Sequence, residues 1–326
     1  MQNPYVFVAG CPRSGTTLLQ RMLTSHPQLA LSNDTHFIPR AIGNMPPGVD
    51  PLLTDEIVER VRNYHRFPRL GLPDEVVLAA ASRSRTYKEF ISALYSAYAR
   101  QYGKPLGGEK TPDYVRHLPM LHGLFPWAKM VHLIRDGRNV ALSVMEWARV
   151  NKGPGRFRLW QENPIAVCAL WWHWQVSTGR RDGIALGPEW YYEVYYEDLV
   201  DKPEQVLRGL CEYLEIPFAV EMLCYYKGKT RYEPGLSAKK AYLPPTPGLR
   251  EWRTQMARRD VELFEALAGD LLAICGYSPG VGVVSSEIEV LSGQLRSKWE
   301  SELAERQAKK AKRLSMPAGG GAGDLS

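Results

Sequence analysis

The chain has 326 residues, of which 44% are hydrophobic and 23% charged, with a formal net charge of +6 and a pI near 9.0. These values are typical of a soluble globular protein with one large domain, or one domain with additions. The positive charge favours attraction of a polyanionic nucleotide, and the sequence lacks the interleaved basic and aromatic residues that indicate nucleic-acid binding.

Hydrophobic periodicity predicts strands that alternate with helices. The expected strands are 6–9, 29–31, 129–134 and 190–196. The expected helices are 17–25, 54–64, 73–81, 86–102, 139–149, 165–178, 203–214 and 260–274. This alternation predicts an α/β fold, with a mainly parallel sheet flanked by helices on both faces. Residues 1–282 would form this domain.

The pattern changes in the last part of the chain. One narrow apolar stripe recurs every fourth residue among charged residues, at Leu291, Leu295, Trp299 and Leu303. It predicts an amphipathic helical extension over 285–314. This helix would dock on the domain or pair with a second copy of the chain in a homodimer. The Gly-rich residues 315–326 predict a disordered tail.

The cysteines and the N-terminus predict the compartment. Five cysteines are scattered and form no C-x-x-C pair, which argues against a disulfide framework or a zinc site. The first strand is expected within a few residues of Met1, which leaves no room for a signal peptide. The most apolar later run, 164–176, is too short to span a bilayer. We therefore expect a cytoplasmic protein without a membrane span.

The most informative segment contains a buried strand, a Gly-bounded turn and the start of a helix. Gly10 and Gly15 have the spacing of a phosphate-binding P-loop. Thr16 occupies the position of the Lys that reaches the β- and γ-phosphates of a triphosphate. Backbone N–H groups from Arg13 to Thr17 are expected to converge on one anion at the helix N-terminus. The Arg13 guanidinium suits a compact anion such as a phosphosulfate.

Together with the loop, further segments resemble the PAPS-dependent sulfotransferases, among them the bacterial enzymes and the protein-tyrosine sulfotransferases. The matching segments are Arg13–Thr17 with Arg21–Leu23, His26-Pro27 and Thr35…Ile38-Pro39-Arg40, then Glu109–Pro112, Lys129–Arg138 with Ser143, and Tyr196–Leu199. Two of these are anion-binding motifs, each at the end of an expected strand. The resemblance implies a P-loop-type sheet and covers about residues 5–275.

The resemblance implies how PAPS (3′-phosphoadenosine 5′-phosphosulfate) is bound. Arg135 and Ser143 would hold its 3′-phosphate, and Tyr196 would lie near the adenine. Arg135 also follows a buried strand, where ligands of open α/β sheets collect, and Arg grips phosphate through two parallel bonds. No metal is implied, because the protein supplies the cations. The residues expected around the 5′-phosphosulfate are Pro12, Arg13, Ser14, Gly15, Thr16 and Thr17.

The implied reaction is in-line transfer of the sulfuryl group to an acceptor hydroxyl or amine. Charge develops on the leaving oxygen, and Arg13, Lys110, Thr16 and Thr17 are expected to stabilise it. Lys110 stands between a Gly pair and Thr-Pro, which favours an ordered, ligand-facing loop.

A base must take the acceptor proton. Relatives have a Glu at the position of Asp34, which keeps the carboxylate with one methylene fewer and is the expected base. His36 is the alternative, since an imidazole titrates near neutrality. In an extended segment the two side chains would share a face. A third interpretation is that Asp34 only turns the loop.

The acceptor is left open as a small-molecule, carbohydrate or lipid-like compound, bound by the aromatic regions 40–105 and 150–185. Two other functions compete. A P-loop nucleotide kinase or phosphotransferase is disfavoured by Thr16 in place of Lys. A non-catalytic nucleotide-binding protein is disfavoured by Lys110 and by the carboxylate of Asp34.

Overall fold

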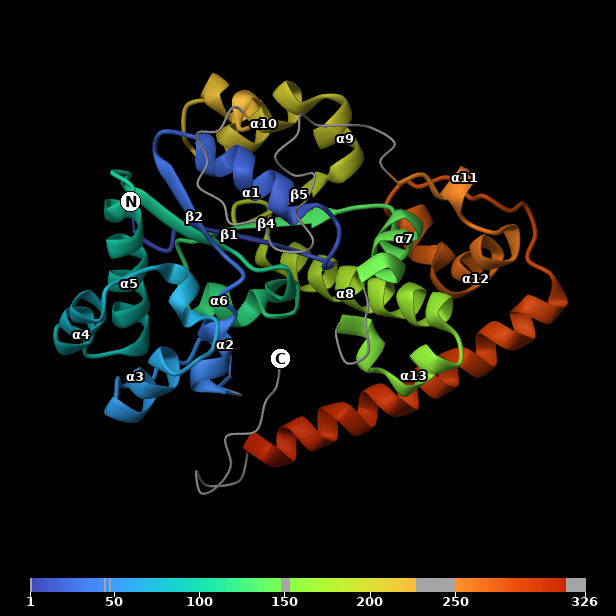
Figure 1. Cartoon of the computed structure of the whole chain (residues 1–326), viewed down its shortest axis with the longest axis horizontal. Coiled ribbons are helices and arrows are strands. Elements are labelled where there is room, and N and C mark those ends of the chain that lie inside the picture. The colour runs from blue at the N-terminus through green and yellow to red at the C-terminus, as the bar shows by residue number, and fades with distance from the viewer. Residues whose placement is uncertain (1, 44, 47, 148–152, 227–249, 315–326) are drawn as a thin grey trace. The chain divides into compact units, whose positions relative to one another are not determined.

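The structure is a computed structural model that describes residues 2–43, 45–46, 48–147, 153–226 and 250–314, the last five as backbone only (Figure 1). The chain forms two compact units. The first contains Met1–Arg135 and Thr178–Pro247, and the second contains Asp136–Ser177 and Gly248–Ser326. The tail expected at 315–326 lies outside the described residues.

The first unit is built on one five-stranded sheet. Its strands are β1 (Val6–Gly10), β2 (Leu29–Asn33), β3 (Leu106–Lys110), β4 (Lys129–Ile134) and β5 (Tyr191–Tyr195). Every neighbouring pair is parallel, in the order β2-β3-β1-β4-β5. The expected α/β fold is therefore confirmed. All five carboxyl ends lie at one edge, and β1 lies where the strand order reverses, which is where such sheets bind ligands.

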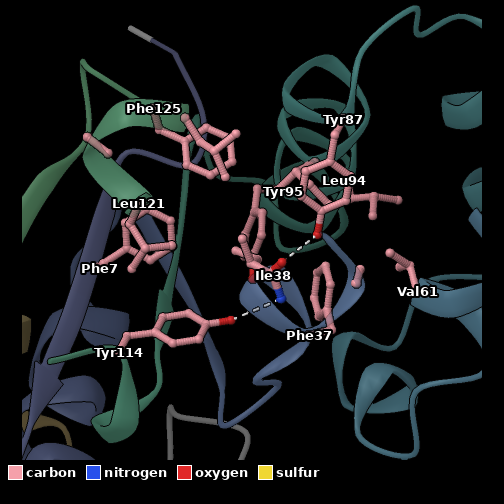
Figure 2. Packing of buried hydrophobic residues seen from close by; sticks show 14 of the residues in the cluster. Phe7, Phe37, Ile38, Val61, Tyr87, Leu94, Tyr95, Tyr114, Leu121 and Phe125 are labelled. Carbon is pink, nitrogen blue, oxygen red and sulfur yellow. Dashed lines mark hydrogen bonds between the residues drawn. The ribbon is translucent and has the colours of Figure 1, made fainter. Parts of the chain in front are cut away.

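Both faces of the sheet are covered by helices, as its buried strands require. Along β1, Phe7 and Ala9 pack into one core cluster, whereas Val6 and Val8 pack into the other. Figure 2 shows part of the first cluster. Its helices are α2 (Phe37–Ile42), α3 (Asp55–Arg62), α4 (Asp74–Ser82), α5 (Tyr87–Gln101), α6 (Leu118–Leu124) and the 3-10 helices η1 (Phe67–Leu70) and η2 (Pro112–Arg116). The second cluster contains α1 (Thr16–Ser25), α9 (Tyr196–Asp201), α10 (Pro203–Tyr213) and η5 (Val220–Cys224).

Strand β3 was not expected from the sequence, because two glycines lower its strand propensity. The structure shows why glycine stands there. A Cβ on Gly107 would lie 2.3 Å from the carbonyl oxygen of Tyr95 in α5, and one on Gly108 would lie 2.3 Å from that of Val6 in β1. The missing side chains therefore let a helix and a neighbouring strand approach β3 closely.

The second unit is helical. Its elements are α7 (Gly137–Trp147), η3 (Gly153–Arg156), η4 (Arg158–Gln161), the first part of α8 (Pro164–Leu186), α11 (Trp252–Gln255), α12 (Arg258–Ile274) and α13 (Ser286–Leu314). Arg138 is fully buried and forms ion pairs with Asp136 and Glu265. Helix α13 docks within its own unit, where the Trp299 ring stacks on Phe157 at 4.0 Å. Across the described parts of both units, no helix has the length and apolarity needed to cross a membrane.

Candidate nucleotide-binding and catalytic site

The loop between β1 and α1 has the tight geometry that its glycines predict. A Cβ on Gly10 would lie 2.4 Å from the Leu133 carbonyl oxygen of β4, so only glycine fits beside that strand. Gly15 and Arg13 have left-handed backbone, with φ of 102° and 80°. The Ser14 N–H donates to the Cys11 carbonyl at 3.1 Å. This N–H therefore closes the turn, which corrects the expectation that every N–H from Arg13 to Thr17 points at the anion.

The loop keeps donors for an anion. Ser14 is fully buried, and its Oγ has no hydrogen-bond partner among the described residues. Helix α1 begins after Gly15 with no side-chain cap in the described part of the chain. The first N–H groups of a helix have no partner within the helix, and the helix dipole favours negative charge there. The loop and the start of α1 therefore fit a compact anion.

Arg135 and Tyr196 follow the ends of β4 and β5, and Tyr196 lies against Gly15 of the same loop. The Arg135 guanidinium lies 4.1 Å from the centre of the Tyr196 ring, within cation–π distance. A Cβ on Gly15 would lie 2.4 Å from Cδ2 of that ring. The structure thus brings together three of the residues expected at the nucleotide. Ser143 is buried in α7 and belongs to the second unit.

Lys110 connects the phosphate loop with the expected base. It is only 1% exposed, and its Nζ donates to Asp34 Oδ1 at 3.0 Å and to Thr17 Oγ1 at 3.4 Å. Lys110 is the last residue of β3, which corrects the expectation of a loop. Burial acts to raise the pKa of Asp34, but the Lys110 ammonium, together with His36 and Arg69, outweighs it and the pKa lies below its ordinary value. Asp34 is therefore an ionised carboxylate at neutral pH.

The segment after β2 is not extended at these residues, so the condition under which Asp34 and His36 would share a face is not met. Both have left-handed backbone, with φ of 49° and 59°. Asp34 contacts Lys110, whereas the His36 ring lies edge-on to Tyr114 at 6.4 Å. Burial lowers the pKa of His36 to about 4, so its imidazole is neutral at pH 7. It is therefore able to accept a proton there, though only as a weak base.

Glu109 is a site residue whose physical role was not predicted from the sequence. It is fully buried, and its carboxylate accepts hydrogen bonds from Thr35 N–H at 3.0 Å and His36 N–H at 3.3 Å, and from the hydroxyls of Thr35, Thr111 and Tyr95. Burial raises its pKa, and the hydrogen bonds oppose this without cancelling it. Its only signal in the sequence was its place directly before Lys110.

Within the described ranges, none of the five cysteines forms a disulfide, and no three His, Cys, Asp or Glu side chains are grouped as ligands for a metal ion. Among the cationic residues, Lys110 ends β3 and Arg135 directly follows β4.

The chain is similar in sequence to known sulfotransferases. A sequence model described as "Sulfotransferase family" matches residues 4–220. Protein-tyrosine sulfotransferase A of Caenorhabditis elegans is 28% identical over 221 residues, which cover 68% of this chain and 52% of the relative. Human protein-tyrosine sulfotransferase 1 is 27% identical over 285 residues, which cover 85% of this chain and 70% of that protein. The chain spans about half the length of the C. elegans relative.

Two solved structures are similar to this chain. The sulfotransferase domain of the Synechococcus PCC 7002 olefin synthase is 26% identical, with a TM-score of 0.47, and covers 70% of this chain and 78% of its own. The sulfotransferase domain from the curacin biosynthetic pathway is 22% identical, with a TM-score of 0.49, and covers 91% of this chain and 99% of its own. Since both TM-scores are below 0.5, the assignment rests on the family match over more than half of the sequence: the chain belongs to the sulfotransferase family.

Proposed function

We propose that this protein is an enzyme that transfers the sulfuryl group of PAPS to a hydroxyl or amine of an acceptor. The observation that carries the proposal is the position of Lys110. Its ammonium contacts both Thr17, in the first turn after the phosphate loop, and Asp34, the candidate base. Lys110 would thus lie within reach of both the nucleotide phosphate and the base that takes the acceptor proton, at the carboxyl edge of the sheet.

The residues of the loop fit a phosphosulfate. The buried Ser14 hydroxyl, the Thr17 hydroxyl and the first N–H groups of α1 would donate hydrogen bonds to it. The Arg135 guanidinium would bind the 3′-phosphate with Ser143, and the Tyr196 ring would lie against the adenine. When bound, PAPS supplies the sulfuryl group, whose bond to the 5′-phosphate oxygen breaks as a bond to the acceptor atom forms.

The cations of the chain would stabilise the leaving group. Negative charge grows on the 5′-phosphate as the sulfuryl group departs, and Arg13 and Lys110 would balance it with the hydroxyls of Thr16 and Thr17. Fixed donors of this kind in a buried site contribute a large share of catalysis, because they need little reorganisation. Lys110 is held in place from two sides and is almost fully buried.

Asp34 is the proposed base. Its ion pair with Lys110 keeps it ionised, so it is ready to take the proton from the acceptor. His36 remains the alternative: burial lowers its pKa to about 4, so its neutral imidazole is also able to accept a proton at pH 7. The Asp34→Asn variant distinguishes these bases.

The acceptor class is part of the proposal. We propose a small-molecule, carbohydrate or lipid-like acceptor and no nucleic acid. The relatives named protein-tyrosine sulfotransferases make a phenolic hydroxyl a suitable first probe. We also propose a cytoplasmic location, which is supported by scattered cysteines without disulfides among the described residues. A homodimer is proposed as well, but the α13 stripe does not support it, because Leu295 and Trp299 are already buried within this chain.

The test is label transfer from PAPS that carries ³⁵S. A panel of tyramine, glucosamine and dodecanol offers a phenol with an amine, a carbohydrate and a lipid-like alcohol. We expect label in at least one of them, with one adenosine 3′,5′-bisphosphate (PAP) released per transfer and no need for Mg²⁺. Transfer of the γ-phosphate of ATP in the presence of Mg²⁺, without sulfuryl transfer, would show that the protein is a kinase. PAP binding without any transfer would favour the non-catalytic alternative.

A further inference from the structure

Glu109 and Lys110 are consecutive residues of β3 with opposite surroundings. Successive side chains of a strand point to opposite faces of the sheet. Lys110 contacts Thr17 of α1, whereas Glu109 accepts a hydrogen bond from Tyr95 of α5 on the other face. Neither side chain is accessible to solvent beyond 1%. A buried carboxylate is costly unless it is well paired, so the groups that bind Glu109 indicate what it does.

Most of these groups belong to the segment that carries the candidate bases. Glu109 Oε1 accepts from the N–H and hydroxyl of Thr35, from the N–H of His36 and from the Thr111 hydroxyl, and Oε2 accepts from Tyr95. Among the described residues, no Lys or Arg forms an ion pair with Glu109. The segment itself therefore provides three of the five hydrogen bonds to this carboxylate, and Thr111 and Tyr95 provide the other two.

The same segment has a backbone that needs support. Asp34 and His36, on either side of Thr35, both have φ in the left-handed region. For residues other than glycine this conformation is sparsely populated and persists when surrounding contacts hold it. Two N–H groups and one hydroxyl of the segment converge on one carboxylate oxygen, which is such a contact.

We propose that Glu109 is a positioning residue that fixes the left-handed backbone of residues 34–36 and so aims Asp34 at the Lys110 ammonium. The effect of Glu109 on catalysis rests on the proposed sulfuryl transfer. Its effect on the backbone of residues 34–36 does not rest on that function and can be measured without PAPS. Glu109 acts through Asp34 and does not itself touch the reacting groups.

The ends of the segment are held independently of Glu109. On one side, the Asp34 N–H donates to the Lys110 carbonyl at 2.8 Å. On the other side, Figure 2 shows Ile38 of α2 between two tyrosines: its N–H donates to the Tyr114 hydroxyl at 3.3 Å, and its carbonyl accepts from the Tyr87 hydroxyl at 2.9 Å. Loss of the Glu109 charge should therefore loosen residues 35 and 36 while the fold persists.

The first experiment follows the segment directly in Glu109→Gln, which keeps the size of the side chain and removes its charge. The His36 pKa is held at about 4 by burial, and it is raised by Asp113 and Asp34 and lowered by Arg66 and Arg40. By NMR titration, we expect Glu109→Gln to move this pKa toward the ordinary 6.5 as the ring gains solvent. Hydrogen exchange of the Thr35 and His36 amides should accelerate at least about tenfold, because charged acceptors bind more strongly than neutral ones.

Glu193→Gln is the matched control. Glu193 also accepts from two hydroxyls, those of Tyr191 and Tyr195, and pairs with Arg180 in the same unit. It lies near His132, whose pKa burial lowers to about 4. The control should leave the His36 titration and the two amides unchanged. The proposal would be overturned if Glu109→Gln kept the wild-type pKa of His36 and the wild-type exchange rates of both amides. It would also be overturned if Glu109→Gln and Glu193→Gln changed these values equally.

The second experiment separates positioning from general support of the site. With the member of the acceptor panel that the wild type uses fastest, kcat of Glu109→Gln should fall about 10²-fold, the cost of a small misplacement of a catalytic group. The Kd for PAP, measured by calorimetry, should stay within about threefold. Wild-type kcat in the variant, or a parallel loss of PAP binding, would contradict the proposal. If the wild type itself transfers no label, the proposed function fails, and the exchange and titration still decide the role of Glu109.

Discussion

Protonation of His36 should cost the folded protein a measurable part of its stability. Burial lowers the pKa of His36 to about 4, against about 6.5 in an unfolded chain. As the pH falls below 6.5, the unfolded state binds the proton first, so stability is lost between about pH 6.5 and pH 4. From these two pKa values, His36 should reduce the free energy of unfolding by about 2 kcal/mol at pH 5 relative to pH 7.5.

The assay is urea unfolding of the wild type and of His36→Asn at both pH values. The drop in unfolding free energy between pH 7.5 and pH 5 should be about 2 kcal/mol smaller in the variant. His132 is buried with a similarly low pKa, but it is present in both proteins and cancels. His65→Asn, at an exposed site, is the control and should keep the wild-type drop. An equal drop in wild type and His36→Asn would refute the burial argument.

Three further variants test the site. Asp34→Asn should lower kcat by roughly 10²–10⁴-fold in the label-transfer assay, the usual contribution of a general base, and an unchanged rate would assign the base to His36. Arg13→Ala should abolish transfer with an unchanged circular dichroism spectrum, and near-normal turnover in the folded variant would remove Arg13 from the leaving-group role. Gly15→Ala should lower the unfolding free energy by about 1–3 kcal/mol, because φ is 102° and the new Cβ would meet the Tyr196 ring, and a stability equal to wild type would contradict that contact.

The parts of the site that depend on local sequence could be predicted. The loop from Gly10 to Gly15 combines a strand, a turn and a helix start within a few residues, so its geometry follows from short-range rules. The alternation of strands and helices gave the parallel sheet. Once the sheet is parallel, the ends of β1, β4 and β5 must share an edge, which brings Arg135 and Tyr196 to the loop.

The parts that depend on distant contacts could not be predicted. Gly107 and Gly108 lower the strand propensity of residues 106–110. Glycine is needed at these two positions because α5 and β1 approach the strand closely. Helix α2 has only six residues and contains Pro39, so its periodic signal is weak. Glu109 meets Thr35 across 74 positions of sequence, and nothing local specifies that contact. In the proposed role of Glu109, the left-handed backbone of Asp34 and His36 depends on this contact, so local sequence could not show whether the segment is extended.

The most direct test of the central claim is calorimetric binding of PAP and of ATP, each with and without Mg²⁺. The proposed PAPS site predicts binding of PAP with a Kd near micromolar, about −8 kcal/mol, independent of Mg²⁺ and much tighter than that of ATP. Tight binding of ATP that requires Mg²⁺, together with no binding of PAP, would contradict the account and favour a phosphotransferase.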